Sequence, residues 1–333
     1  MDMGCSSFSW ETMDGTHLLG RTYDQFGDLR ANRVIAVPAG VLCAAELGAD
    51  SEKRPGRYEY TGMAVLGFGE PVVVDGVNGA GLMGALLHYP GYAVYQDERE
   101  TGKIPVHPGR LLGWLLSQCG GVDEAVRALS SIALTKDTVA GNPLPAHYIL
   151  SDRSGEAVIV EPDEGGLSIH RQSLGVLANS PDYGWHRTHL RSFVGVTNRP
   201  KKPQIVAGHE IREFGERLGG GFGLPGDYSS PSRFVRLAFM KEFAVRGRKE
   251  LEGVSRMFRA FALVDIPEGL VRDETEPGAY EQTLCTSVMC AESGVYYFAP
   301  AWNRRISAVR LLREGSEMRC FDLGEGQDVD YRN

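Results

Sequence analysis

The chain has 333 residues, 42% of them apolar and 23% charged, which is enough apolar material for a substantial core. Its net charge of −8 argues against nucleic-acid binding, which usually needs a basic face. No apolar run reaches the ~18 residues that a membrane span needs, and no N-terminal apolar segment has the pattern of a secretory signal. We therefore expect a cytoplasmic protein without nucleic-acid or membrane partners.

Strand patterns fill the first hundred residues. Segments 3–12 and 16–24 flank Asp14-Gly15, a dipeptide that favours a tight hairpin turn. Further strands are expected within residues 33–40, 60–69 and 71–95. Two helices follow at 109–118 and 122–132, the first preceded by Pro108 and the second acidic in its first turn.

The second half of the chain repeats this order. Short alternating runs at 147–152, 156–163 and 167–171 predict strands separated by glycine-containing turns. Helical periodicity marks 230–245, with Ser230 as the expected cap, and 253–263. The last strands are expected at 283–290, 294–300 and 305–311. Two helix pairs over two packed sheets predict an α+β fold of four layers, αββα, in a single domain.

Cys5 stands near a chain end, where a structural cysteine stabilises little. One interpretation is a small buried strand residue, which is common for cysteine. The other is a nucleophile. Removal of residues 1–4 would make Cys5 the N-terminus, and its own α-amine could then take the thiol proton. Gly4 would leave the cleavage point without an obstructing side chain.

Three other segments carry polar residues of possible chemical use. In GRTYD (20–24), Arg21 and Tyr23 face one side of a strand and Asp24 the other, so that arginine could lower the thiol pKa and aspartate could hold the amine. A solvated surface pair is the competing interpretation. Asn179 precedes Ser-Pro at a strand end, where an amide is either a turn former or an oxyanion donor. Arg233 lies in a first helical turn, where the dipole disfavours a cation.

Together these segments resemble the choloylglycine hydrolase family of N-terminal-nucleophile hydrolases, and within it the penicillin V acylases. The resemblance covers essentially the whole chain and rests on MGCSS, GRTYD, DGVN-x-x-GLMGA, VLANSPDYGWH, GLPGDYSSPSRFVR and TS-x-MC in this order. It implies the αββα sandwich, no metal and no organic cofactor. It also implies a pro-segment at residues 1–4 and a mature domain at 5–333.

The resemblance implies a role for each matched residue. Cys5 is the nucleophile, and Asp24 contacts its amine. Arg21 and Arg233 lie beside the thiol, and Asn179 donates to the oxyanion. The expected substrate contacts are Tyr23, Asn78 and His88. Of these, His88 begins HYPGY, where bile salt hydrolases resemble NFPGY and the acylases often carry tyrosine at the first of these positions.

We expect an amidase that cleaves penicillin V into phenoxyacetate and 6-aminopenicillanate. Conjugated bile salts and N-acyl homoserine lactones are the alternative substrates, because each presents an amide beside an apolar group. A ligand-binding protein with an unprocessed Cys5 is the alternative outside the enzymes. The family resemblance further implies a homotetramer.

Overall fold

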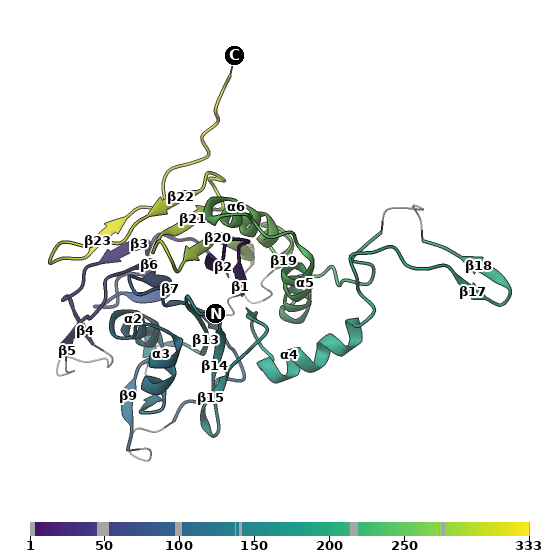
Figure 1. The fold of residues 1–333 in the computed structure, drawn as a ribbon. Coiled ribbons are helices and arrows are strands. Elements are labelled where there is room, and N and C mark those ends of the chain that lie inside the picture. Colours follow the sequence, from purple (N-terminus) through teal and green to yellow (C-terminus); the bar gives the residue numbers. More distant parts are fainter. Residues whose placement is uncertain are drawn as a thin grey trace.

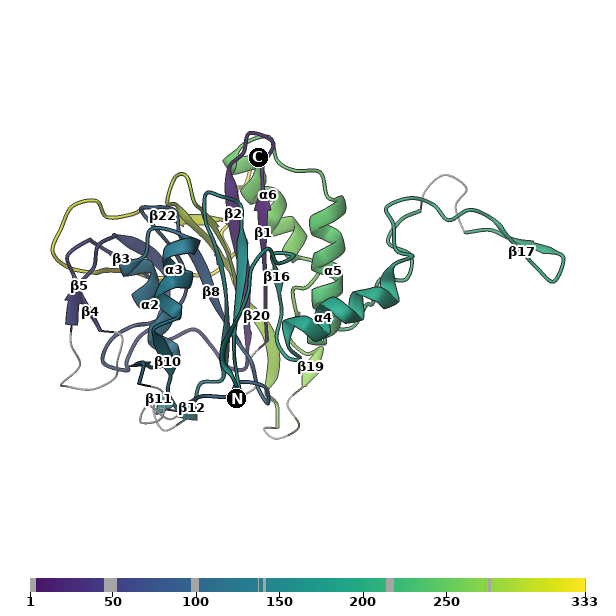
Figure 2. The same cartoon turned by 60° about the horizontal axis from the view of Figure 1, so that its bottom comes forward.

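The structure is a computed structural model that describes residues 4–44, 53–96, 102–136, 138–139, 142–213, 219–272, 274 and 277–332. Residues 1–3, part of the expected pro-segment, lie outside these ranges. Two antiparallel sheets pack face to face, with helices on their outer sides (Figures 1 and 2). The α+β fold with four αββα layers is therefore confirmed.

The first sheet carries the N-terminal hairpin. Its β1 and β2 pair around a turn in which Gly15 has a φ of 84°, as the Asp14-Gly15 signal predicts. The described strands follow the order β16-β1-β2-β20-β21-β22, with β19 beside β20. Their bounds are β1 Cys5–Glu11, β2 His17–Gln25, β16 Val176–Leu177, β19 Val271–Arg272, β20 Tyr280–Cys290, β21 Tyr296–Pro300 and β22 Ser307–Val309.

The second sheet faces the first and is built from strands within residues 32–170 and one late strand. Its described strands follow the order β15-β14-β13-β8-β7-β6-β3-β23. Their bounds are β3 Asn32–Val37, β6 Tyr60–Val65, β7 Val72–Asn78, β8 Met83–His88, β13 Ala146–Ser151, β14 Ala157–Asp163, β15 Gly166–His170 and β23 Arg319–Phe321. Short two-stranded ribbons complete the strands: β4 Leu42–Ala44 with β5 Lys53–Pro55, β9 Ile104–Val106 with β10 Ile132–Leu134, β11 Thr138–Val139 with β12 Asn142–Pro143, and β17 Gln204–Val206 with β18 His209–Ile211.

Each sheet is covered by a helix pair that the sequence places between its strands. Helices α2 (Pro108–Gln118) and α3 (Val122–Leu129) bury their apolar faces against the second sheet. The second of these helices was expected to reach residue 132, but Ile132 already pairs in β10. Helices α5 (Ser230–Phe243) and α6 (Glu250–Phe261) cover the first sheet, where Phe8 of β1 packs against Phe261 at 4.8 Å between ring centroids.

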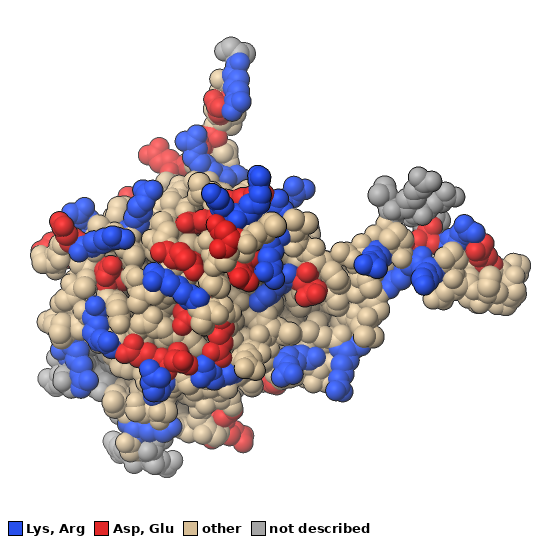
Figure 3. Space-filling model, viewed as in Figure 1, with Lys and Arg blue, Asp and Glu red and all other residues tan. Residues whose placement is uncertain are grey.

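One part of the molecule was not predicted. Helix α4 (Tyr183–His189) and a 3₁₀ turn (Leu190–Phe193) lead into an arm, the described residues 195–213 and 219–225, that projects from the body (Figures 1 and 2). On the face shown in Figure 3, acidic and basic side chains are interspersed over the body. Among the described residues, no helix is both long and apolar enough to cross a bilayer.

Candidate active site

The thiol of Cys5 lies inside the molecule, at the first residue of β1. Cys5 pairs with Tyr23 of β2 and is 1% exposed. Directly opposite residues of antiparallel strands point to the same side, and Arg21 lies on that side two residues before Tyr23. The Arg21 Nη2 group consequently donates to the Cys5 sulfur at 3.0 Å. The hairpin thus delivers the arginine that the GRTYD segment predicted.

Burial has the largest effect on the Cys5 thiol. Removal from water raises its pKa, the Arg21 cation opposes that shift, and the net pKa lies above the ordinary value. Arg21 thus lowers the thiol pKa, as the sequence predicts, and burial has the larger effect in the opposite direction. The thiol stays protonated until a base takes its proton, so this site needs one close by.

Arg21 is fixed on three sides. Its guanidinium carbon lies 4.2 Å from the centroid of the Tyr23 ring, and Nη1 reaches Asp75 Oδ2 at 3.3 Å from the facing sheet. Burial disfavours the Arg21 cation, but the Cys5 sulfur and the Asp75 carboxylate outweigh this and raise its pKa. Tyr23, expected as a substrate contact, packs here against Arg21 and is 5% exposed. The sequence interpretation did not identify Asp75.

Asp24 lies on the opposite side of β2 from Arg21, as strand alternation predicts. Its carboxylate accepts from Thr283 Oγ1 at 2.6 Å and Thr22 Oγ1 at 3.2 Å, and Arg233 Nη1 lies 3.6 Å away. Burial raises the pKa of this carboxyl despite the opposing effect of Arg233. The backbone N–H of Asp24 donates to the carbonyl oxygen of Gly4 at 3.1 Å. Asp24 therefore borders the Gly4–Cys5 peptide.

Asn179 follows β16 and touches the same peptide. Its Oδ1 accepts from the Cys5 backbone N–H at 2.9 Å, and its Nδ2 donates to the His88 carbonyl at 2.7 Å. Its own N–H donates to Ser230 Oγ at 2.9 Å. Ser230 is the first residue of α5, and its hydroxyl holds the backbone of Asn179 in place. The expectation that Ser230 caps α5 is wrong, because Ser229 occupies the cap position.

The contacts of Arg233 explain why a cation lies in the first turn of α5, where the helix dipole disfavours it. Its Nη1 donates to the Cys5 carbonyl oxygen at 2.6 Å and to Ser6 Oγ at 2.5 Å, while Nη2 donates to Asn179 Oδ1 at 2.7 Å. The residue is 3% exposed. Arg233 therefore contacts the backbone of the nucleophile, and in the described contacts it is Arg21 that reaches the thiol.

Gly4 lines a cleft of about 450 Å³ between α5 and the start of β20. A Cβ on Gly4 would lie 2.1 Å from Glu281 Oε1 and 3.1 Å from Asp24 Cβ. A side chain here would require the Glu281 carboxylate to swing away and the Asp24 side chain to shift by a few tenths of an ångström, so glycine is the residue that fits without such shifts.

The two remaining candidates differ in outcome. His88 ends β8, is 4% exposed, and offers its carbonyl to Asn179 as described above. The described hydrogen bonds of Asn78 involve none of the residues around Cys5. Its Nδ2 donates to the Leu116 and Cys119 carbonyls at 2.8 and 2.7 Å, and its Oδ1 accepts from two backbone N–H groups of its own loop. These bonds hold α2 to the sheet, and the substrate role expected for Asn78 stays a prediction.

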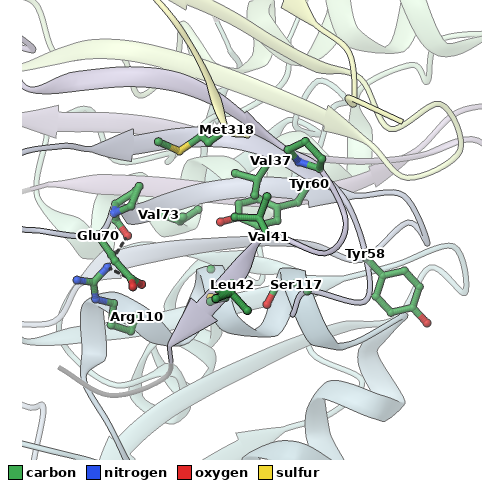
Figure 4. A pocket seen from close by; sticks show the side chains of 15 residues that line it. Val37, Val41, Leu42, Tyr58, Tyr60, Glu70, Val73, Arg110, Ser117 and Met318 are labelled. Atoms are coloured by element: carbon green, nitrogen blue, oxygen red, sulfur yellow. Dashed lines mark hydrogen bonds and ion pairs between the residues drawn. The ribbon is translucent and has the colours of Figure 1, made fainter. Parts of the chain in front are cut away.

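A separate cavity of about 160 Å³ lies on the other side of the second sheet, under α2 and the β4–β5 ribbon (Figure 4). Its walls are mostly apolar, with Val41, Leu42 and Val73 around it and the Glu70–Arg110 pair at one end. It shares no lining residue with the cleft at Gly4. We therefore assign the chemistry to the cleft.

An αββα sandwich with a thiol at the start of an inner strand is the arrangement of the N-terminal-nucleophile hydrolases. Residues 5–323 match the linear amide C–N hydrolases of the choloylglycine hydrolase family. The chain belongs to this family, and it is a hydrolase of linear amide C–N bonds.

Individual relatives are similar over different lengths. A bile salt hydrolase/transferase from Clostridium perfringens is 28% identical and covers 99% of this chain and 100% of the relative. A crystal structure of a mutant conjugated bile acid hydrolase from the same species has a TM-score of 0.88, with 26% identity and coverage of 99% and 100%. A penicillin V acylase from Pectobacterium atrosepticum is 26% identical, covering 77% of this chain and 68% of the relative. These similarities favour the bile salt alternative over the penicillin V substrate expected from the sequence.

Proposed function

We propose that this chain hydrolyses the amide bond of conjugated bile salts, with Cys5 as its N-terminal nucleophile. The observation that carries the proposal is the set of contacts around one residue: Arg21 on the sulfur, Asn179 on the nitrogen and Arg233 on the carbonyl oxygen of Cys5. A protein that only binds a ligand has no need of all of these contacts around one cysteine. We further propose that residues 1–4 are removed and that 5–333 form one mature domain.

Removal of the pro-segment can use the same groups. The Asp24 N–H polarises the Gly4 carbonyl, so that carbon is the electrophile for the neighbouring thiol. Attack forms a sulfur–carbon bond, the C–N bond breaks, and the Cys5 nitrogen takes the proton that the thiol loses. Water then hydrolyses the thioester and releases residues 1–4 as a free acid. The net reaction consumes one water and leaves the α-amine of Cys5 free.

In turnover that amine is the base that the protonated thiol requires. An α-amine has an ordinary pKa of about 7.7–8.0, so a substantial fraction is neutral near pH 7–8. It takes the thiol proton during attack on the substrate carbonyl and returns it to the departing amine. Asn179 stabilises the oxyanion through an Nδ2 group that now donates to His88. Water finally hydrolyses the thioester on Cys5.

Substrate choice is tested by comparing two amides in parallel. We expect kcat/KM for a taurine- or glycine-conjugated bile salt to exceed that for penicillin V by at least ~10-fold, which corresponds to a difference of about 1.4 kcal/mol in transition-state binding. The measurement is the release of free amino acid or 6-aminopenicillanate at equal enzyme concentration. A higher kcat/KM for penicillin V would instead support the penicillin V acylase assignment. Hydrolysis of neither amide would contradict both assignments.

His88 offers a matched pair of variants for the same assay. Its carbonyl serves Asn179 whatever the side chain, so His88→Asn and His88→Tyr are expected to keep measurable hydrolysis. We expect His88→Asn to move the kcat/KM ratio toward the bile salt and His88→Tyr to move it toward penicillin V. Unchanged ratios in both variants would remove the His88 side chain from substrate selection.

We also propose a homotetramer, as the family resemblance implies. The arm supports this assembly, because a projecting segment with exposed apolar side chains is suited to contact another copy of the chain. Five large apolar side chains on or beside the arm are 56–87% exposed: Val194, Ile205, Val206, Ile211 and Phe222. Light scattering on the purified full chain should give four times the chain mass. A monomer at micromolar concentration would contradict this assembly.

A further inference from the structure

The buried carboxylate of Asp75, on β7 of the second sheet, contacts the machinery around Cys5. It is 1% exposed and ion-paired with Arg21, which is also 1% exposed. We propose that Asp75 is a positioning residue that acts through Arg21 and holds its guanidinium against the Cys5 sulfur. This inference rests on the proposed function of Cys5 and adds a residue to it.

The contacts of Asp75 come from hydrogen-bond donors on both of its oxygens. Oδ2 accepts from Arg21 Nη1 at 3.3 Å and from Ser287 Oγ at 2.9 Å. Oδ1 accepts from Tyr296 OH at 2.6 Å and from the Met63 N–H at 3.3 Å. Burial raises the pKa of Tyr296 well above its usual range, so its hydroxyl keeps the proton that it donates. A carboxylate, which accepts on both oxygens, fits this surrounding.

A β-bulge is what points Asp75 toward the first sheet. Met63 of β6 pairs with Asp75, but the next residue, Ala64, pairs with Val73, so Val74 is the extra residue in β7. Val73 packs toward α2, whereas Val74 joins the apolar core of the other face and Asp75 reaches Arg21 on that same side. Without the bulge, regular alternation after Val74 would turn the Asp75 side chain to the α2 side of the sheet, away from Arg21.

The same geometry shows why an amide cannot replace the carboxylate. Arg21 Nη1 and the Met63 N–H are donors that cannot become acceptors, and they lie on different oxygens of Asp75. An asparagine would place its NH₂ group against one of them. Rotation of the Ser287 and Tyr296 hydroxyls cannot relieve that conflict. Arg21 would then lose either its partner or the anchor of that partner, and its hold on the sulfur would loosen.

The test is a double-mutant cycle with Asp75→Asn, Arg21→Leu and the double variant. Each protein is expressed as the full chain and assayed after residues 1–4 have been removed. We expect Asp75→Asn to lower kcat about 10- to 100-fold, the range for losing a hydrogen bond to a charged group, with KM changed less than about 3-fold. In the Arg21→Leu background the same substitution should cause no further fall in kcat, because Asp75 has nothing left to position.

Tyr296→Phe is the milder companion, since it removes one anchor of Asp75 and leaves both charges in place. We expect a smaller fall in kcat that also vanishes in the Arg21→Leu background, and this variant serves if Asp75→Asn does not fold. Losses that multiply in either cycle, or an unchanged kcat in Asp75→Asn, would overturn the proposal. The cycle uses whichever of the two amides the wild type hydrolyses, so a wrong substrate assignment is detected separately by the wild-type rates.

Discussion

Cys5→Ala is expected to abolish turnover, with a loss of at least ~10⁴-fold in kcat, and to leave residues 1–4 attached. Both losses have one cause, because the sulfur is the nucleophile for the Gly4 carbonyl and for the substrate. The fold should persist, since the substitution removes one buried atom from the end of a strand whose pairing with β2 is unaffected. Cys5→Ser should hydrolyse poorly, because a hydroxyl ionises far less readily than a thiol.

The matched control is Cys285→Ala. Cys285 is also buried and lies across from Tyr23 on the far side of β2, but none of its described hydrogen bonds reaches Cys5. Burial raises the pKa of its thiol, as it does for Cys5, but Cys285 lies inside the chain and has no α-amine of its own to take the thiol proton. We expect the control to process and to keep turnover within about 10-fold of wild type. Significant turnover by Cys5→Ala, with wild-type contamination excluded, would point to a different nucleophile.

Gly4→Val is expected to retain residues 1–4 and to lose turnover to the same extent. A Cβ at this position already meets Asp24 Cβ at 3.1 Å and Glu281 Oε1 at 2.1 Å, and the two further methyl groups of valine add to the conflict. The Gly4 carbonyl would then leave the Asp24 N–H that polarises it. Intact-mass analysis reports the processing, and the bile salt assay reports the turnover.

Gly326→Val is the control for this change of residue type. Gly326 lies in the C-terminal segment, and a Cβ there would meet nothing within 4 Å. It should process and turn over like wild type. Normal processing of Gly4→Val would remove the steric argument for glycine before the cleavage point, while leaving the role of Cys5 to be judged from its own variant.

Much of the site could be predicted from sequence because its residues carry local signals. Cys5 lies near a chain end, Arg21 shares a strand face with Tyr23, and Arg233 occupies a place that the helix dipole disfavours. Each signal is weak, and their order along the chain made them specific. The fold followed from two helix pairs set between strand groups, which the structure retains.

The parts that were missed depend on contacts that no short segment encodes. Asp75 could have been noticed as a charge inside the apolar run VVVDGVN, but its direction is set by a bulge against β6 that the sequence does not mark. Asn78 was expected to contact substrate from the family resemblance, and the sequence did not indicate that its amide bonds the Leu116 carbonyl of α2. The sequence predicted the effect of Arg21 on the thiol pKa, but not the larger opposing effect of burial, which only the packed structure reveals.

The most direct test of an N-terminal Cys5 nucleophile is the intact mass of wild-type enzyme taken from a preparation with measured turnover. The mass should equal that of residues 5–333, and it is the same whether translation begins at Met1 or Met3. Brief mixing with substrate and acid quenching should add one acyl group to the peptide that begins at Cys5. A fully active preparation that retains any of residues 1–4 would contradict the account.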